Sequence, residues 1–205
     1  MKKFLSIFLA VVTLLSCAVS FAAAESTDAK TSAENRVYTE GEFDYTTLET
    51  PVLLTSFGQS ADVSMLNALF KKLDEEVDYT FEPLATAEEV AQYKTVIIAA
   101  GMSSKGLGAA GISEESEFSR AEEIINTVKE NDITVIFAHL GGSARRGAKS
   151  DQFADMVLGI SSYLIFVEEG DLSDHKFSNY AINNNLPYTA IFTIVDALEP
   201  LNEMF

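Results

Sequence analysis

The side chains best suited to chemistry follow an apolar run, 133–138, and precede a helical pattern that begins near Ser150. They are His139, one of two histidines in the chain, and the adjacent arginines Arg145 and Arg146. A guanidinium group is planar and always charged, and it pairs well with carboxylate or phosphate. His139 could act as a base or donate to a bound anion. The spacing indicates an anion site where a strand gives way to a helix.

Two further loops have the same place and character. One spans 55–60 after the apolar run 52–55, and the other spans 101–108 after the run 95–100. Lys105 in the second loop offers another cation. We expect the three loops to bind a small anionic ligand through Ser56, Gly58, Gln59, Ser60, Gly101, Ser103, Ser104, Lys105, His139, Gly141, Gly142, Arg145 and Arg146.

These groups also have a structural interpretation. Arg145 and Arg146 could instead pair with acidic residues of nearby helices. The ring of His139 could be satisfied by backbone carbonyls. Acids such as Asp62 and Asp151 lie at expected helix starts, where carboxylates stabilise unpaired amides. The residue types leave both interpretations open.

A serine hydrolase is the alternative function. Ser60, His139 and Asp62 are of the types that form a nucleophile, a base and an orienting acid. The G-x-S-x-G turn that exposes such a serine is absent, and Ser60 would serve equally well as a helix cap. We therefore expect a binding module rather than an enzyme. Hydrolysis by Ser60 and His139, or a protein-interaction domain, remain the alternatives.

No cofactor is expected. Residues 106–111 match the dinucleotide fingerprint G-x-G-x-x-G, but that motif must follow its strand directly so that the helix start meets the pyrophosphate. Here residues 101–105 intervene, and Glu114 at the next helix start would oppose a phosphate. Since His175 is the sole companion of His139, a transition-metal site is not expected either.

Short apolar runs alternate with amphipathic stretches about six times from Pro51 onward. This predicts a single three-layer α/β domain with a doubly wound, mostly parallel sheet of about five or six strands, flavodoxin-like or Rossmann-like. We favour the order 2-1-3-4-5, with the last strand at the edge. Ligands bind such sheets where strand order reverses, here between strands one and three. The expected strands are 52–55, 77–81, 95–100, 133–138, 163–167 and 190–194, and the expected helices are 63–73, 86–92, 113–128, 150–160, 174–183 and a terminal one from 196.

Three loop strings resemble those of a known family. They are LTSFGQSAD at 54–62, GMSSKGLGAAG at 101–111 and HLGGSARRG at 139–147. They resemble the bacterial exported proteins classed as domain of unknown function 6305, over about residues 51–205. The resemblance implies a secreted or lipid-anchored single domain and assigns no reaction.

The first 24 residues have the features of an export signal. Lys2 and Lys3 form a positive end, an apolar run spans 4–16, and small residues at 22–24 suit cleavage before Glu25. The run is too short to remain as a spanning helix. We expect an exported protein, extracellular or in the cell envelope.

Cys17, the single cysteine, leaves a second route open. The string from Leu14 to Cys17 resembles a lipobox, which would give a lipid anchor, although the chain stays apolar after it. With ordinary cleavage the mature chain has no thiol, which excludes disulfides. Residues 25–50 are predicted to be a polar spacer, with contact points at 37–38 or 43–45, and residues 51–205 the α/β domain.

The formal charge of −17 becomes −19 once the two lysines of the leader are lost. Such a chain repels nucleic acid and anionic lipid, because phosphate backbones are bound by clustered cations. We expect no nucleic-acid partner and no membrane contact beyond a lipid anchor. The acidity suits solubility outside the cell.

Overall fold

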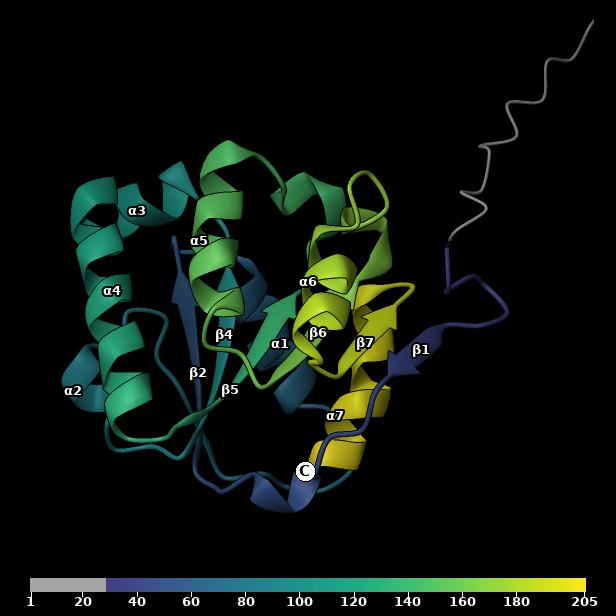
Figure 1. The fold of residues 1–205 in the computed structure, drawn as a ribbon. Coiled ribbons are helices and arrows are strands. Elements are labelled where there is room, and N and C mark those ends of the chain that lie inside the picture. Colours follow the sequence, from purple (N-terminus) through teal and green to yellow (C-terminus); the bar gives the residue numbers. More distant parts are fainter. Residues whose placement is uncertain (1–28) are drawn as a thin grey trace, which may run out of the picture.

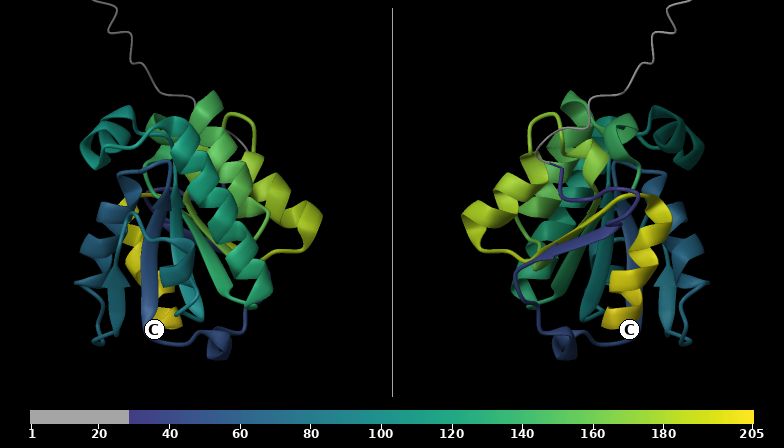
Figure 2. Two further views of the ribbon diagram at one scale, coloured as in Figure 1. Left: turned by 90° about the vertical axis from the view of Figure 1, so that its left-hand side faces the viewer. Right: turned by 90° about the vertical axis from the view of Figure 1, so that its right-hand side faces the viewer.

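The computed structural model describes residues 29–205. The predicted export signal, the possible lipobox at Cys17 and the predicted cleavage site before Glu25 lie outside the described residues. The described chain forms a seven-stranded sheet in the order β1-β7-β6-β5-β4-β2-β3, with helices on both faces (Figures 1 and 2). The predicted three-layer, doubly wound, mostly parallel α/β fold is confirmed.

All neighbouring strands run parallel except β1, which pairs antiparallel with β7. The strands are β1 (Val37–Glu40), β2 (Val52–Phe57), β3 (Tyr79–Phe81), β4 (Thr95–Ala100), β5 (Thr134–His139), β6 (Tyr163–Val167) and β7 (Tyr188–Ile191). The α-helices are α1 (Asp62–Phe70), α2 (Ala87–Val90), α3 (Ser104–Ala110), α4 (Glu114–Glu130), α5 (Ala148–Leu158), α6 (Lys176–Asn184) and α7 (Leu198–Met204). Short 3-10 turns are η1 (Tyr45–Thr47), η2 (Gly142–Arg145), η3 (Glu168–Gly170) and η4 (Ile194–Ala197).

The six predicted strands, now β2 to β7, follow the order favoured from the sequence, except that β1 lies outside β7, which is therefore not the edge strand. β2 lies between β3 and β4, so strand order reverses there. Ser56 of β2 pairs with Ala99 of β4, and Ala99 pairs with Ala138 of β5. The carboxyl ends of these three strands are therefore level, and the loops after them share one edge of the sheet.

The central strands are buried on both faces. Every residue of β2, β4 and β6 is buried, as expected of parallel strands covered by helices on both sides. One face packs against α2, α4, α5 and α6, and the other packs against α1 and α7 (Figure 2). No helix within residues 29–205 is long and apolar enough to cross a bilayer.

The predicted spacer is held at both expected contact points. Residues 37–40 form β1, an unpredicted seventh strand at the sheet edge. The rings of Phe43 and Tyr45 lie 5.1 and 6.2 Å from the ring of Tyr163. β1 escapes prediction because its residues are half-buried or exposed and show no apolar run.

The largest departure from the prediction is α3, which occupies a stretch interpreted from the sequence as a glycine-rich loop tip. The hydroxyl of Ser103 caps the helix by accepting from Gly106 N at 3.0 Å. Gly111 ends it with a φ of +69°, a conformation that suits glycine. These two end signals outweigh the cost of glycine inside the helix, about 1 kcal/mol each.

Other bounds shift by a few residues. β7 begins at Tyr188 rather than at Ala190, because Tyr188 is already paired with Leu164 of β6. α1 ends at Phe70, so Leu73 lies beyond it. The expected helix 113–128 is α4, which extends to Glu130.

Candidate functional site

The three predicted loops meet at the carboxyl edge of the sheet. Gly101 N donates to the carbonyl of Phe57 at 3.0 Å, and Ser103 N donates to the carbonyl of Gly58 at 2.9 Å. A Cβ atom on Gly101 would lie 3.3 Å from Ser60 Oγ and 3.8 Å from the carbonyl of Arg145. Glycine at position 101 therefore lets the other two loops pack against the second.

Asp62 ties the first loop to the third. Its carboxylate is fully buried and accepts from Leu140 N and Gly141 N, each at 2.9 Å. Arg145 Nε donates to the other oxygen at 3.1 Å. The side chain of Arg145 is 34% exposed. A buried carboxylate needs such partners, so Asp62 has a structural role here.

A second buried carboxylate, that of Glu117 of α4, holds the first loop in place through hydrogen bonds. Gly58 N donates to it at 2.8 Å, and the amide of Gln59 donates at 3.4 Å. Arg120 pairs with Glu117 at 2.7 Å and also donates to the carbonyl of Ser56. The sequence argument missed this pair. Its signal is an oppositely charged pair spaced i, i+3 on an otherwise apolar helix face.

Arg146 is engaged by two carboxylates. It contacts Asp151 of α5 at 2.8 Å and Asp174 at 2.8 Å, and it stacks on Phe177, 5.0 Å from the ring centroid. Burial opposes its charge, but the hydrogen bonds that Arg146 donates to Asp151 and Asp174 raise the pKa of Arg146 overall. The structure thus places Arg146 in the pairing arrangement that the sequence left as the alternative.

His139 ends β5 in an enclosed position. The residue is 1% exposed, and neither ring nitrogen has a hydrogen-bond partner. Its ring lies 4.7 Å from the ring of Phe177. Burial lowers the pKa of His139, and this outweighs the opposing charge of Asp62. His139 is therefore neutral at neutral pH.

The serine, histidine and acid of the hydrolase alternative do not form a relay. Ser60 is 2% exposed, and its hydroxyl accepts from Asp62 N at 3.3 Å. The ring of His139 makes no hydrogen bond to Ser60 or to any other described residue. Asp62 is committed to the third loop. A nucleophile needs a base within hydrogen-bond reach, and this arrangement lacks it.

The remaining predicted residues are dispersed. Ser56 Oγ donates to the carbonyl of Pro83 at 3.0 Å. Gly142, with a φ of +56°, lies against the carboxylate of Glu169. Ser104 and Lys105 are exposed on α3. The loops come together, but their polar groups mostly bind one another.

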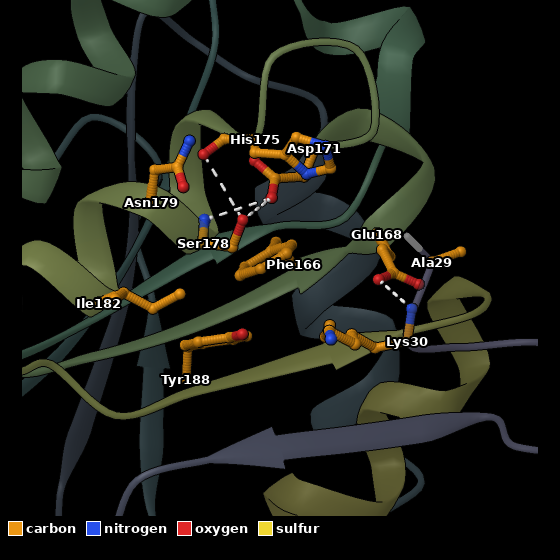
Figure 3. Close-up of a pocket in the computed structure, with 11 residues that line it drawn as sticks. Ala29, Lys30, Phe166, Glu168, Asp171, His175, Ser178, Asn179, Ile182 and Tyr188 are labelled. Carbon is orange, nitrogen blue, oxygen red and sulfur yellow. Dashed lines mark hydrogen bonds between the residues drawn. The ribbon is translucent and has the colours of Figure 1, made fainter. Parts of the chain in front are cut away.

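A hollow of about 410 Å³ lies away from the three loops, between α6, β7 and the start of the described chain (Figure 3). Its floor is formed by Phe166 and Tyr188, whose rings stack with centroids 5.4 Å apart. Ser178, Asn179 and Ile182 of α6 line one side. Figure 3 shows Ile182 and Lys30 at opposite sides of the hollow.

Two buried carboxylates form its acidic wall. Glu168 accepts from Lys30 N at 2.6 Å and from the amide and hydroxyl of Thr31 at 2.7 and 2.6 Å. Asp171 accepts from Phe177 N at 2.6 Å and from both the amide and hydroxyl of Ser178. Glu168 thereby fixes the start of the described chain, and Asp171 caps α6.

The pKa of Tyr188 reflects the burial and the negative charges around the hollow. Burial raises its pKa to about 12, with further contributions from Tyr38, Glu40, Asp171 and Glu168. The ammonium of Lys30 lies 5.8 Å from the ring centroid of Tyr38. The hollow is therefore acidic, with one ammonium group at its rim.

The sequence argument missed the hollow, although part of its signal was present. Glu168 and Asp171 directly follow a buried strand at its carboxyl end, where ligands of such sheets bind. The residues predicted from the sequence to bind a ligand are mostly cations, serines and loop glycines of the three loops. Within residues 29–205 no group of three or more metal-ligating side chains is placed to hold a metal ion.

The fold and the hollow define an α/β domain of the doubly wound class. The model of the family described as domain of unknown function 6305 (DUF6305) matches residues 49–205. The chain therefore belongs to this family, which confirms the resemblance seen in the three loop strings. Comparison with curated proteins gives no match.

Two solved structures resemble part of the chain. One is a GDSL-like lipase from Bacteroides thetaiotaomicron, with 15% identity over 67% of this chain and 65% of that one and a TM-score of 0.28. The other is an acylhydrolase, so named provisionally, from Bacteroides fragilis, with 15% identity over 67% and 64% and a TM-score of 0.29. The chain spans just under two thirds of each. At these TM-scores the likeness carries no argument about function.

Proposed function

We propose that this protein, after export, binds a small organic molecule in the hollow between α6 and β7. One observation carries the proposal. A stacked aromatic pair, Phe166 and Tyr188, and the two buried carboxylates of Glu168 and Asp171 border one hollow of about 410 Å³.

The size and lining of the hollow support the proposal. Ligand sites enclose about 300–1,000 Å³ and combine apolar surface with a few polar groups. Here about 410 Å³ is bounded by an aromatic floor, an acidic wall and the polar first turns of α6. On one side the hollow reaches Glu168 and Asp171, which follow the carboxyl end of β6, the end of the sheet where ligands of this fold class bind.

The loop cluster supports a ligand less well. Arg146 is neutralised by two carboxylates and Arg145 by one, so their charges offer little net attraction to an anion. Ser60 and His139 are enclosed and not bonded to each other. We therefore favour binding over hydrolysis.

A thermal-shift screen of the purified protein tests the proposal. The probes are millimolar amines, sugars, amino acids, nucleosides and carboxylates. A ligand at about a hundred times its Kd stabilises by about 2.7 kcal/mol, which raises the Tm of a domain of this size by roughly 5 to 10 °C. Asn179→Trp, an exposed position lining the hollow, should abolish the rise.

Two variants sharpen the test. Asn126→Trp, at an exposed asparagine of α4 outside the hollow, should leave the rise intact. Tyr188→Phe keeps the ring and removes the hydroxyl, so it should weaken binding of the ligand without lowering the Tm of the ligand-free protein. A rise that persists unchanged in Asn179→Trp, or no rise with any probe, would refute the proposed site.

A further inference from the structure

We propose that the ligand of this hollow is an organic cation, a small amine joined to an apolar body. This inference rests on the proposed function and names the chemical class that the site would select. It depends on three features: the sign of the charges that line the hollow, the acceptor atoms that remain on its carboxylates, and the aromatic floor.

The charges at the hollow sum to a negative value. Glu168 and Asp171 are 7% and 2% exposed, so solvent screens their charges weakly. The ammonium of Lys30 is the one opposing permanent charge in the lining, and it makes no ion pair with the described residues. A cation is therefore favoured over a neutral molecule, and an anion is disfavoured.

Both carboxylates retain acceptor capacity. A carboxylate offers about four lone-pair positions, and Glu168 and Asp171 each accept three hydrogen bonds from the chain. One position on each is left for a further donor. An ammonium group has three N–H donors, and its hydrogen bonds to carboxylates are charge-assisted.

The floor suits the same ligand. The faces of aromatic rings attract cations, and the chain already places the ammonium of Lys30 over the ring of Tyr38 beside the hollow. Ile182, 58% exposed at the rim, offers contact for an apolar body. Beyond Ile182 lies a second hollow of about 300 Å³ lined by Glu40 and Glu42, so the acidic surface continues outward.

Three probe molecules of similar shape but different charge test whether the hollow prefers a cation, a neutral molecule or an anion. They are benzylamine, benzyl alcohol and benzoate, measured by isothermal titration calorimetry at neutral pH and low salt. We expect benzylamine to bind about tenfold or more tighter than benzyl alcohol, the difference that a charge-assisted hydrogen bond makes. Benzoate should bind most weakly, and added salt should weaken benzylamine.

Lys30→Met gives the sharpest test, because it removes the opposing cation and leaves both structural carboxylates in place. The backbone amide of residue 30, which Glu168 holds, is unchanged. Benzylamine should then bind more tightly than in the wild type. Lys129→Met, with the same charge change at an exposed site on α4, should have little effect.

The outcomes separate this inference from the proposed function. If benzoate binds tightest, and Lys30→Met weakens it, the hollow binds anions; the inference is then wrong while the binding function stands. Benzyl alcohol equal to benzylamine, or no binding by any of the three probes, also overturns the cation assignment. Failure of the whole thermal-shift screen would remove the binding function itself.

Discussion

Asp62 of α1 and Arg145 of η2 form an ion pair 3.1 Å long across two loops. The same carboxylate accepts the amides of Leu140 and Gly141, so one buried side chain after β2 positions the loop after β5. Leu140 follows Asp62 by 78 residues in the sequence. The convergence of these loops is thus maintained by a specific buried acid as well as by the sheet.

Asp62→Asn should destabilise the domain. The amide keeps the volume but loses the charge, and its NH₂ group accepts no hydrogen bond, so either the two loop amides or Arg145 Nε loses its acceptor. Breaking a buried pair in this way costs about 3–5 kcal/mol, measurable as the free energy of unfolding in urea. Arg145→Gln should cost less, because the arginine is partly exposed and solvent compensates its loss. Equal losses in the two variants would contradict this account.

Arg146→Gln tests whether this arginine serves the fold. It leaves Asp151 and Asp174 without their common cation and removes the contact with Phe177. We expect a loss of about 2 kcal/mol or more in the free energy of unfolding. Lys149→Gln breaks an exposed pair with Glu114 and should cost less than about 0.5 kcal/mol. An unchanged Arg146→Gln would restore the case for an anion site.

The parallel part of the fold is predictable because buried strands appear as continuous apolar runs. The bounds predicted for β4 and β6 agree with the structure, and both strands are buried throughout. β1 and α3 were not predicted. β1 is an edge strand of half-exposed residues. α3 contains two glycines, and its N-terminal cap and C-terminal glycine offset their low helix propensity.

The candidate site was harder to predict because tertiary packing creates it. The three loops meet as expected, but the sequence could not show that Arg145 and Arg146 would find carboxylates there. The hollow joins Lys30 to Glu168, which are 138 residues apart. No local pattern links the start of the chain to the end of β6, although the acids after β6 were visible.

His139→Leu should make stability less sensitive to acid. The pKa of His139 is lowered by burial, so below about pH 6.5 the unfolded chain takes up a proton that the folded chain does not. Stability of the wild type therefore falls as the pH drops through 6.5 toward the folded pKa. The variant lacks this loss and leaves no unpartnered ring nitrogen. Urea unfolding at pH 7, 6 and 5 should show the free energy of unfolding of the variant rising relative to that of the wild type at each step. A difference that stays constant with pH would contradict the lowered pKa.

Gly142→Ala and Gly108→Ala should change stability in opposite directions. Gly142 has a φ of +56°, and a Cβ there would meet Glu169 Oε2, the acceptor of Ser143 N. Alanine is strained in that conformation and would displace Glu169, so we expect a loss of about 1–2 kcal/mol. Gly108 lies within α3, and a Cβ there meets nothing within 4 Å. Alanine is the better helix former by about 1 kcal/mol, so Gly108→Ala should raise the Tm. If both variants were stabilised, η2 would tolerate a side chain at Gly142, and the close approach of Glu169 to this loop would not constrain it.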